Sequence, residues 1–146
     1  MFTLRVDLVC ILIVLFGASP ILLAQQKVGI HVKPPGVIID KSPDPKRIFI
    51  GSPSIAILPN GAYVASHDFF GPGTTFDTCA VFRSEDRGKT WDKTAVLKGM
   101  FWPLLFVCKG KLYAISSTGR WSSLVVRRSD DGGRTWTESP GMRTAA

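Results

Sequence analysis

Short runs of β-branched and aromatic residues, interrupted by turn residues, recur along the middle of the chain. One pair of runs, residues 55–58 and 63–66, is joined by Pro-Asn-Gly, and a second pair, residues 104–107 and 112–116, is joined by Lys-Gly. Apolar runs of this length around such turns are typical of β-hairpins. The pattern therefore predicts two antiparallel hairpins.

A polar motif follows each predicted hairpin. Ser-x-Asp-x-Gly-x-Thr-Trp occupies residues 84–91 and again residues 129–136, so the two copies are 45 residues apart (129 − 84). A strand is expected before each copy, at about residues 79–84 and 123–128, and another after each tryptophan. Each repeat then has four strands, and the spacing is that of a β-propeller blade rather than of most helical repeats.

Turn geometry explains the residues of the motif. In the first copy, Asp86 is expected to accept hydrogen bonds from backbone amides across the turn, and Ser84 supplies a second polar tie. Gly88 permits the positive φ of a tight turn, and Trp91 can fold its ring back over the turn. The work of these residues is structural rather than catalytic. The second copy has the same residues at the equivalent positions, namely Ser129, Asp131, Gly133 and Trp136.

These residues match the Asp-box, and across residues 47–138 the chain resembles the sialidase-like family of β-propellers. The resemblance implies an all-β fold with about two four-stranded antiparallel blades, at about residues 50–98 and 101–140, within a partial propeller of residues 47–146. In that family the propeller has six blades. Two blades leave sheet faces without a neighbour, so we expect a fragment or a truncated product.

Residues 1–24 differ in character from the rest of the chain. Arg5 is followed by an apolar run over residues 8–16 and then by small and apolar residues as far as Ala24. This is the layout of an export signal, and the run is shorter than the ~20 residues that span a bilayer. We expect cleavage after Ala24, residues 25–46 as an N-terminal arm, and a secreted, periplasmic or cell-surface protein with no stable membrane span. An uncleaved N-terminal anchor is the alternative.

The formal net charge is +7, which favours acidic partners such as anionic glycans. The Lys and Arg residues are scattered without a dense basic run, so we expect no nucleic-acid partner. Cys10 lies in the expected leader, which leaves Cys79 and Cys108 either as a disulfide or as two free thiols. No residue spacing indicates a metal site, and we expect no cofactor.

The connections of an antiparallel blade alternate between two rims. The Asp-box turns share one rim with the hairpin turns, and the other rim collects the loops between the second and third strands together with the crossings between blades. In sialidase-like proteins this second rim is the substrate face, so its loops are expected to hold the site. The loop expected in the first blade, residues 67–77, is longer than its counterpart at residues 117–122.

The resemblance implies a general acid in the longer loop. Sialidases place an aspartate there, and glycoside cleavage requires a carboxyl group that protonates the departing oxygen. Asp77 is the nearest match, and Asp68 is a second candidate. His67, beside Asp68, is either a substrate contact or proton carrier, or a polar residue that closes a strand.

Sialidases also hold the substrate carboxylate with three arginines, because guanidinium groups bind carboxylates through paired hydrogen bonds. Gly51 stands where the first of these arginines is expected. Arg120 is either an anion contact or a solvated loop residue. Trp102, on the expected crossing into blade two, either stacks on a sugar ring or caps the blade. Tyr63 and Tyr113 are expected to pack at matching places in the two repeats.

The resemblance implies carbohydrate as the partner of the protein. The leading hypothesis is a fragment of an exported, exo-α-sialidase-like glycoside hydrolase that acts on or binds carbohydrate, with the first arginine of the clamp missing. The alternatives are a non-catalytic Asp-box propeller that binds glycan or protein, and an inactive truncated product. Further blades that carry a Tyr nucleophile and its Glu partner would favour the hydrolase.

Overall fold

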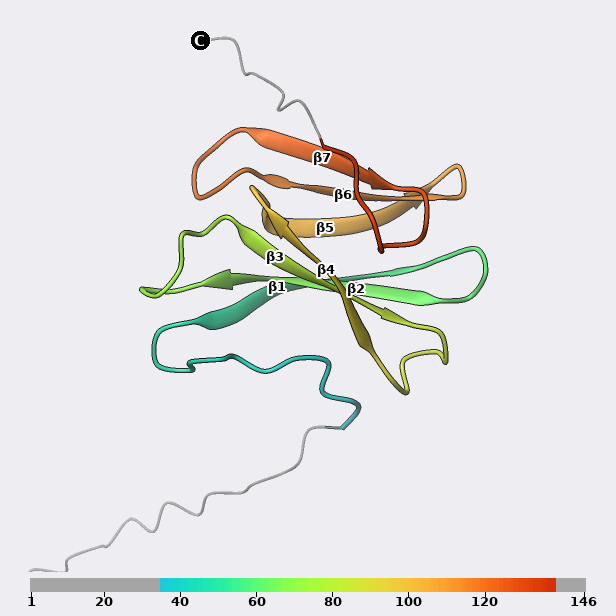
Figure 1. Cartoon of the computed structure of the whole chain (residues 1–146), viewed down its shortest axis with the longest axis horizontal. Helices are drawn as coiled ribbons and strands as arrows, with labels where there is room; N and C mark the ends of the chain where they lie inside the picture. The colour runs from blue at the N-terminus through green and yellow to red at the C-terminus, as the bar shows by residue number, and fades with distance from the viewer. Residues whose placement is uncertain (1–34, 139–146) are drawn as a thin grey trace, which may run out of the picture. The chain divides into compact units, whose positions relative to one another are not determined.

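The computed structural model describes residues 35–138 of the chain (Figure 1). This part contains seven β-strands and no helix. The expected leader, and the expected fourth strand of blade two beyond residue 138, lie outside this range. No helix within it is long and apolar enough to cross a membrane. The strands are β1 (Phe49–Ile57), β2 (Tyr63–Phe70), β3 (Thr78–Ser84), β4 (Asp92–Lys98), β5 (Phe101–Cys108), β6 (Lys111–Ser117) and β7 (Leu124–Ser129).

The strands form two antiparallel sheets in chain order. The first sheet has the order β1-β2-β3-β4, and the second has the order β5-β6-β7. Each sheet begins with a hairpin whose turn contains a glycine with positive φ, Gly61 at 83° and Gly110 at 75°, as tight hairpin turns require. The predicted all-β fold with two antiparallel blades is confirmed, including the strand after Trp91.

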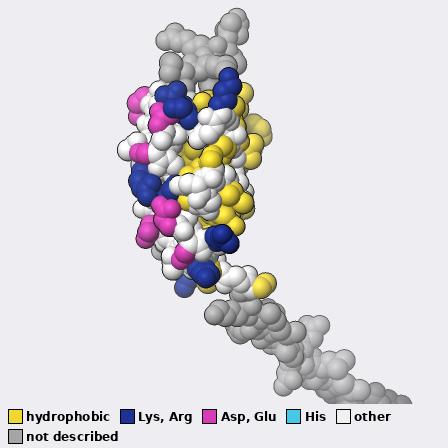
Figure 2. All heavy atoms as spheres, turned by 90° about the vertical axis from the view of Figure 1, so that its right-hand side faces the viewer, with side chains coloured by type: hydrophobic (Ala, Val, Ile, Leu, Met, Phe, Trp, Pro, Cys, Tyr) yellow, Lys and Arg dark blue, Asp and Glu magenta, His cyan; other side chains and the backbone are white. Residues whose placement is uncertain are grey.

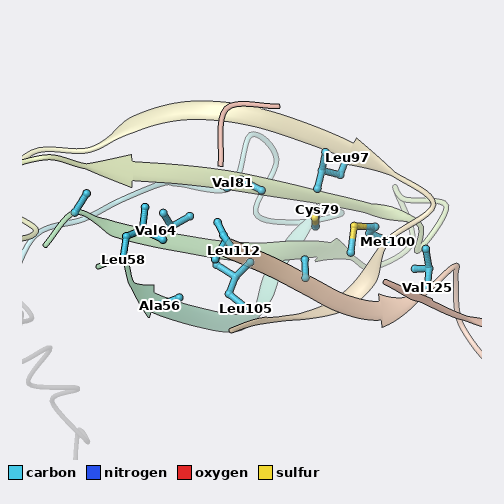
Figure 3. Packing of buried hydrophobic residues seen from close by; sticks show 12 residues of the cluster. Ala56, Leu58, Val64, Cys79, Val81, Leu97, Met100, Leu105, Leu112 and Val125 are labelled. Atoms are coloured by element: carbon cyan, nitrogen blue, oxygen red, sulfur yellow. The ribbon is translucent and has the colours of Figure 1, made fainter. Parts of the chain in front are cut away.

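The two sheets lie face to face, with β5 packed against β1 and β2 (Figure 1). Successive side chains of a strand point to opposite faces, so every second residue enters the space between the sheets. Val64 and Val81 enter it from the first sheet, and Leu105 and Leu112 enter it from the second, all 5% exposed or less (Figure 3). Each such side chain contributes roughly 1.5–3 kcal/mol to folding. This interface is the main core.

The first strand of each sheet carries a bulge at the same place. The pairing register shifts within residues 51–54 of β1 and within residues 101–104 of β5. In both strands the bulge contains a residue with positive φ that precedes a proline: Ser52 at 48° and Trp102 at 57°. A bulge bends its strand and redirects the side chains around it. The two bulges therefore shape the same end of both sheets.

Both sheets also have a face that points away from the other sheet. Ile55 and Ile57 on the first sheet are 57% and 59% exposed, and Leu104 on the second sheet is 58% exposed. On the second sheet, the rings of Phe106 and Tyr113 are stacked with their centroids 5.4 Å apart. In Figure 2 hydrophobic side chains gather along one side of the molecule, while charged ones occupy the other. The apolar faces are of the kind that neighbouring blades cover in a propeller.

The expectation that Tyr63 and Tyr113 occupy matching places in the two repeats is wrong. Tyr63 pairs with Ser84, and Leu112 pairs with Ser129, so Leu112 rather than Tyr113 is the counterpart of Tyr63. Because side chains alternate along a strand, the two tyrosines lie on opposite faces of their blades.

Both cysteines in the described part of the chain are free thiols. Cys79 is buried in the core on β3, and Cys108 is exposed at the end of β5. Burial raises the pKa of the Cys79 thiol to about 12, so this group stays protonated at neutral pH. Of the two alternatives that the sequence left open, the structure has the free thiols.

Candidate functional site

The rim with the hairpin turns is closed by side-chain hydrogen bonds. The Ser84 hydroxyl accepts the N–H of Gly88 at 2.7 Å and donates to Asp86 Oδ1 at 2.8 Å. The Asp86 carboxylate also accepts the backbone N–H of Thr90 at 2.9 Å and the Thr90 hydroxyl at 2.7 Å. Trp91 Nε1 donates to the Gly88 carbonyl at 3.0 Å. The turn is therefore held by its own side chains.

The second copy of the turn repeats this geometry. The Ser129 hydroxyl accepts the N–H of Gly133 at 2.7 Å and donates to Asp131 Oδ1 at 2.8 Å. Asp131 accepts the backbone N–H of Thr135 at 2.9 Å and the Thr135 hydroxyl at 2.6 Å. Trp136 Nε1 donates to the Gly133 carbonyl at 3.3 Å, and its ring packs against the core. All of these polar groups are used within the turn.

The two turn carboxylates are held in the ionised form. Hydrogen bonds from the backbone and side chain of Thr90 lower the pKa of Asp86 well below its ordinary value. Burial is the largest single influence on Asp131 and opposes its ionisation, but the hydrogen bonds from Thr135, Ser129 and Arg134 together outweigh it and lower the pKa to about 2. A group that stays ionised at every physiological pH is unsuited to donating a proton. This rim is architectural.

The opposite rim carries a groove of about 470 Å³ between the two sheets. The bulges of β1 and β5, the end of β2 and the two loops that follow β2 and β6 surround it. No carboxyl group lines this groove within the described residues. Its lining consists of glycines, aromatic rings, one hydroxyl and one guanidinium, supplied by Gly51, Ser52, Phe70, Gly71, Phe76, Phe101, Trp102 and Arg120.

Aromatic rings form a connected cluster in and beside the groove. Phe101 is stacked on Trp102 with centroids 5.0 Å apart, and Phe76 meets Phe101 edge-on at 5.5 Å. Trp121 meets Trp102 at 87° with centroids 6.2 Å apart. Trp102 is 53% exposed and Trp121 is 82% exposed. Two indole rings at right angles therefore stand open to solvent at this rim.

Arg120 lies among these rings. Its guanidinium carbon is 5.4 Å from the centroid of Phe76 and 5.9 Å from the centroid of Trp121. Cation–π contacts of this kind are worth about 0.5–1 kcal/mol at exposed sites, enough to favour one orientation of the side chain. The structure thus brings together two of the residues expected at the site from sequence, Arg120 and Trp102. Trp102 lies in β5 itself, at the bulge, rather than on a crossing that precedes the blade.

Asp68 and His67 belong to a strand, not to a loop as expected. β2 continues to Phe70 because it pairs with β1 through Phe49 and Phe70, which shortens the loop to residues 71–77. The Asp68 side chain is fully buried, and its Oδ2 accepts the backbone N–H of Trp102 at 2.9 Å. A buried carboxyl group cannot reach a glycosidic oxygen in this arrangement. Asp68 therefore lies under the rim as a tie between the sheets.

His67 contacts the N-terminal arm rather than the groove. Its Nε2 lies 3.0 Å from Asp40 Oδ2, and its Nδ1 lies 3.2 Å from the Asp68 carbonyl oxygen. Lys93 reaches the same Asp40 oxygen at 3.2 Å. His67 is 6% exposed and lines a separate hollow of about 360 Å³ under the arm. These contacts place it on the face of blade one that points away from blade two.

Asp77 lies at the end of the loop before β3, outside the groove lining. Its Oδ1 accepts hydrogen bonds from the hydroxyls of Thr75 at 2.5 Å and Thr78 at 2.8 Å, and Lys98 Nζ is 3.9 Å away. The Thr75 hydrogen bond, followed by that of Thr78, lowers the pKa of Asp77. A general acid requires a raised pKa, so the surroundings of Asp77 favour the opposite state.

The position expected to carry the first clamp arginine is closed by an aromatic ring. A Cβ atom added at Gly51 would lie 2.6 Å from Cε1 of Phe70 and 3.5 Å from Oδ1 of Asp68. A contact of 2.6 Å is well inside van der Waals distance. No side chain fits at residue 51 while the Phe70 ring stays in place. Phe70 is in turn packed against Phe49, with ring centroids 5.3 Å apart.

Three aromatic residues of the cluster were not among the residues predicted from sequence: Phe76, Phe101 and Trp121. Each stands next to a residue that was considered there, since Phe76 precedes Asp77, Phe101 precedes Trp102, and Trp121 follows Arg120. Their signal is the density of aromatic residues on loops and bulges of one rim, where the repeat itself has no aromatic requirement.

No protein-family model matches the chain, and no curated protein matches it. Among solved structures, an α-L-arabinanase of Penicillium chrysogenum complexed with arabinobiose is similar at 25% identity and a TM-score of 0.51, over 60% of this chain and 30% of that enzyme. An α-L-arabinofuranosidase of Fusarium graminearum is similar at 21% identity and a TM-score of 0.50, over 62% of this chain and 30% of the enzyme. A Trypanosoma rangeli sialidase has 27% identity and a TM-score of 0.48, over 56% of this chain and 13% of the sialidase. The two blades have the fold of propeller glycoside hydrolases. The chain covers 30% of the length of the arabinanase and 30% of the length of the arabinofuranosidase.

Proposed function

We propose that this chain forms two blades of an exported, carbohydrate-active β-propeller and that the aromatic groove between the blades binds a sugar. The observation that carries the proposal is the pair of exposed indoles, Trp102 and Trp121, set at right angles beside the groove with Arg120 next to them. Sugar rings present C–H groups on their faces and hydroxyl groups at their edges. An aromatic platform with one guanidinium donor complements both.

The geometry favours a neutral sugar over a sialic acid. Carboxylate recognition by paired hydrogen bonds requires arginines that converge on one point. Gly51 has no room for such an arginine, and Arg120 is the one guanidinium that lines the groove among residues 35–138. The similarity to an arabinanase that was solved with arabinobiose supports the same choice and supplies a neutral test ligand.

Within this proposal, the chain contributes sugar binding, and hydrolysis belongs to a propeller with further blades. Glycoside cleavage requires an acid and, on the other side of the scissile bond, a second catalytic group such as a carboxylate or a tyrosine nucleophile. Neither candidate in the described part meets the requirement of an acid, because Asp68 is buried and the pKa of Asp77 is lowered. The same two observations favour the second candidate function, a non-catalytic propeller that binds a glycan.

Titration calorimetry of the full chain with arabinobiose tests the binding proposal. We expect measurable binding that Trp121→Ala weakens by about tenfold, or about 1.4 kcal/mol, because one stacking face is lost. Phe106→Ala, on the outer face of the second sheet, is the matched control and should leave the affinity unchanged. No heat of binding with the wild-type chain, or equal affinity in Trp121→Ala, would overturn the proposal.

Two further measurements separate the finer parts of the proposal. Incubation of the complete propeller with arabino-oligosaccharides should release sugar if it is a hydrolase and should release none if it only binds.

Export through residues 1–24 predicts that the secreted protein begins at Gln25, which N-terminal sequencing of the exported chain reads directly.

A further inference from the structure

Trp102 adopts a backbone conformation that a large residue before a proline strongly disfavours. Its φ is 57°, in the left-handed region, and Pro103 follows it in the chain. Side chains with a Cβ rarely occupy this region, and the proline ring further restricts the preceding residue to extended conformations. Such a conformation persists only where surrounding contacts fix it. The orientation of the Trp102 indole at the groove therefore depends on whatever holds its backbone.

The Asp68 carboxyl group is the contact that holds it from the neighbouring sheet. Asp68 is fully buried on β2, and its Oδ2 accepts the N–H of Trp102 at 2.9 Å across 34 residues of chain. Its other oxygen, Oδ1, has no hydrogen-bond partner among the described residues. Burying a carboxyl group disfavours folding unless its partners compensate. Among the described residues, the Trp102 amide is the hydrogen-bond partner that compensates for burying the Asp68 carboxyl group.

The equivalent position in the second blade has no such role. Ser117 pairs with Phe101 as Asp68 pairs with Gly51, so the two residues occupy the same place in their sheets. The Ser117 hydroxyl donates to the carbonyl of Phe101 within its own blade, at 3.1 Å. The left-handed bulge residue is repeated, since Ser52 has it as well, whereas the hydrogen bond between Asp68 and the Trp102 amide is specific to this pair of strands.

We propose that Asp68 is a positioning residue that holds the Trp102 amide from the neighbouring sheet and so presents the indole to a sugar in the groove. The inference rests on the proposed sugar-binding function for the ligand, but the positioning of Trp102 is independent of it. Asp68 acts through Trp102 and does not touch the ligand. Its removal weakens binding because the indole leaves the orientation that meets Trp121 at 87°.

Fluorine NMR of the full chain labelled with 5-fluorotryptophan tests the proposal, with the Trp102 resonance assigned from its absence in Trp102→Phe. Asp68→Ser introduces the residue of the equivalent position in blade two, whose shorter side chain does not reach the Trp102 amide. We expect it to shift or broaden the Trp102 resonance, to leave the Trp91 and Trp136 resonances in place, and to lower the affinity for arabinobiose at least about tenfold. Asp68→Asn keeps an oxygen that accepts the same hydrogen bond, so it should preserve both properties. Ser117→Ala is the matched control and should change neither.

The outcomes separate this inference from the function on which it rests. An unchanged Trp102 resonance in Asp68→Ser, or an equal change in Asp68→Asn, would overturn the positioning role. If Asp68→Ser instead disturbs the Trp91 and Trp136 resonances as strongly as that of Trp102, Asp68 supports the whole fold, and the specific role is overturned. A wild-type chain that does not bind arabinobiose, with the Trp102 resonance still sensitive to Asp68→Ser, would refute the sugar ligand and support the positioning of Trp102.

Discussion

The two rims of this molecule use the same residue types for different ends. On one rim, Asp86 and Asp131 accept matching sets of hydrogen bonds, and the two turns agree residue by residue. On the other rim, the loops differ in length and sequence, and Asp68 holds a residue of the other sheet. The rim whose turns repeat is therefore structural, and the rim whose loops differ between the blades holds the candidate site.

The tryptophans show the same contrast. Trp91 and Trp136 use their indole N–H groups to close the turns from which they come. Trp102 and Trp121 have no counterpart of their kind in blade one, where Ser52 takes the bulge position of Trp102. They are exposed, and their rings pack with other aromatic rings and with Arg120. An exposed aromatic pair outside the repeat pattern is the stronger indication of binding.

The largest expected effect concerns the residue that closes the clamp position. Gly51→Arg should destabilise the fold by about 3 kcal/mol, because its Cβ would overlap the Phe70 ring and overpacking of this kind costs about 1–3 kcal/mol or more. Urea denaturation followed by tryptophan fluorescence measures the change. Gly119→Ala, where the added Cβ meets Phe76 O at an ordinary 3.5 Å, is the control. A Gly51→Arg variant as stable as the wild type would show that the site has room for the clamp.

The second expected effect tests the architectural rim alone. Ser129→Ala should lower the free energy of unfolding by about 2 kcal/mol, because the N–H of the buried Gly133 loses its acceptor. The affinity for arabinobiose should stay unchanged, since the groove lies on the other rim. A loss of sugar affinity with no change in stability would reverse the roles that we assign to the two rims.

A smaller effect is expected from acid. The folded-state pKa of Asp131 is about 2, below the ordinary value of 3.8, so the folded state binds fewer protons than the unfolded state between these values. Stability from this group is present above about pH 4 and is lost as the pH falls toward 2. Thermal melts across this range should show the decline, and Asp131→Asn should make the decline shallower. A stability that does not depend on this residue between pH 4 and pH 2 would contradict the assignment.

The smallest effect is expected at Asp77, the acid suggested by the family resemblance. Asp77→Asn should leave arabinobiose affinity within about twofold of the wild type, because Asp77 hydrogen-bonds to its own loop and does not line the groove. Calorimetry of this variant beside Trp121→Ala gives the comparison on one scale. An Asp77→Asn variant that loses as much affinity as Trp121→Ala would move the site from the aromatic cluster to the loop.

The sequence predicted the sheets and the turns because their signals are local and occur twice. The 45-residue spacing of Ser84 and Ser129 and the glycines of the hairpins determine strand order with little help from distant contacts. The residues of the site were harder to predict, because their positions depend on how the strands pair with one another. Whether Asp68 belongs to a loop or to a strand is decided by its pairing with Gly51, which no local pattern reveals.

Burial was the other property that local patterns did not reveal. His67 and Asp77 were expected near the substrate because both lie in the segment predicted as the longer loop of blade one, yet His67 turns toward Asp40, 27 residues earlier in the chain. The aromatic cluster joins Phe76 of one blade with Phe101 of the next, a contact that exists only once the sheets stack. The residues of the repeat could therefore be placed from the sequence, whereas the surroundings of the loop residues depend on contacts between distant segments.

We propose the groove between the blades, lined by Trp102 and Arg120, as the place where a neutral sugar binds. Titration of the isotope-labelled full chain with arabinobiose, followed by amide chemical-shift changes, tests it most directly. We expect saturable shifts that concentrate at Ser52, Trp102 and Arg120, with the turn residues of the opposite rim unchanged. Shifts confined to the turns around Asp86 and Asp131, or no saturable shifts at all, would contradict it.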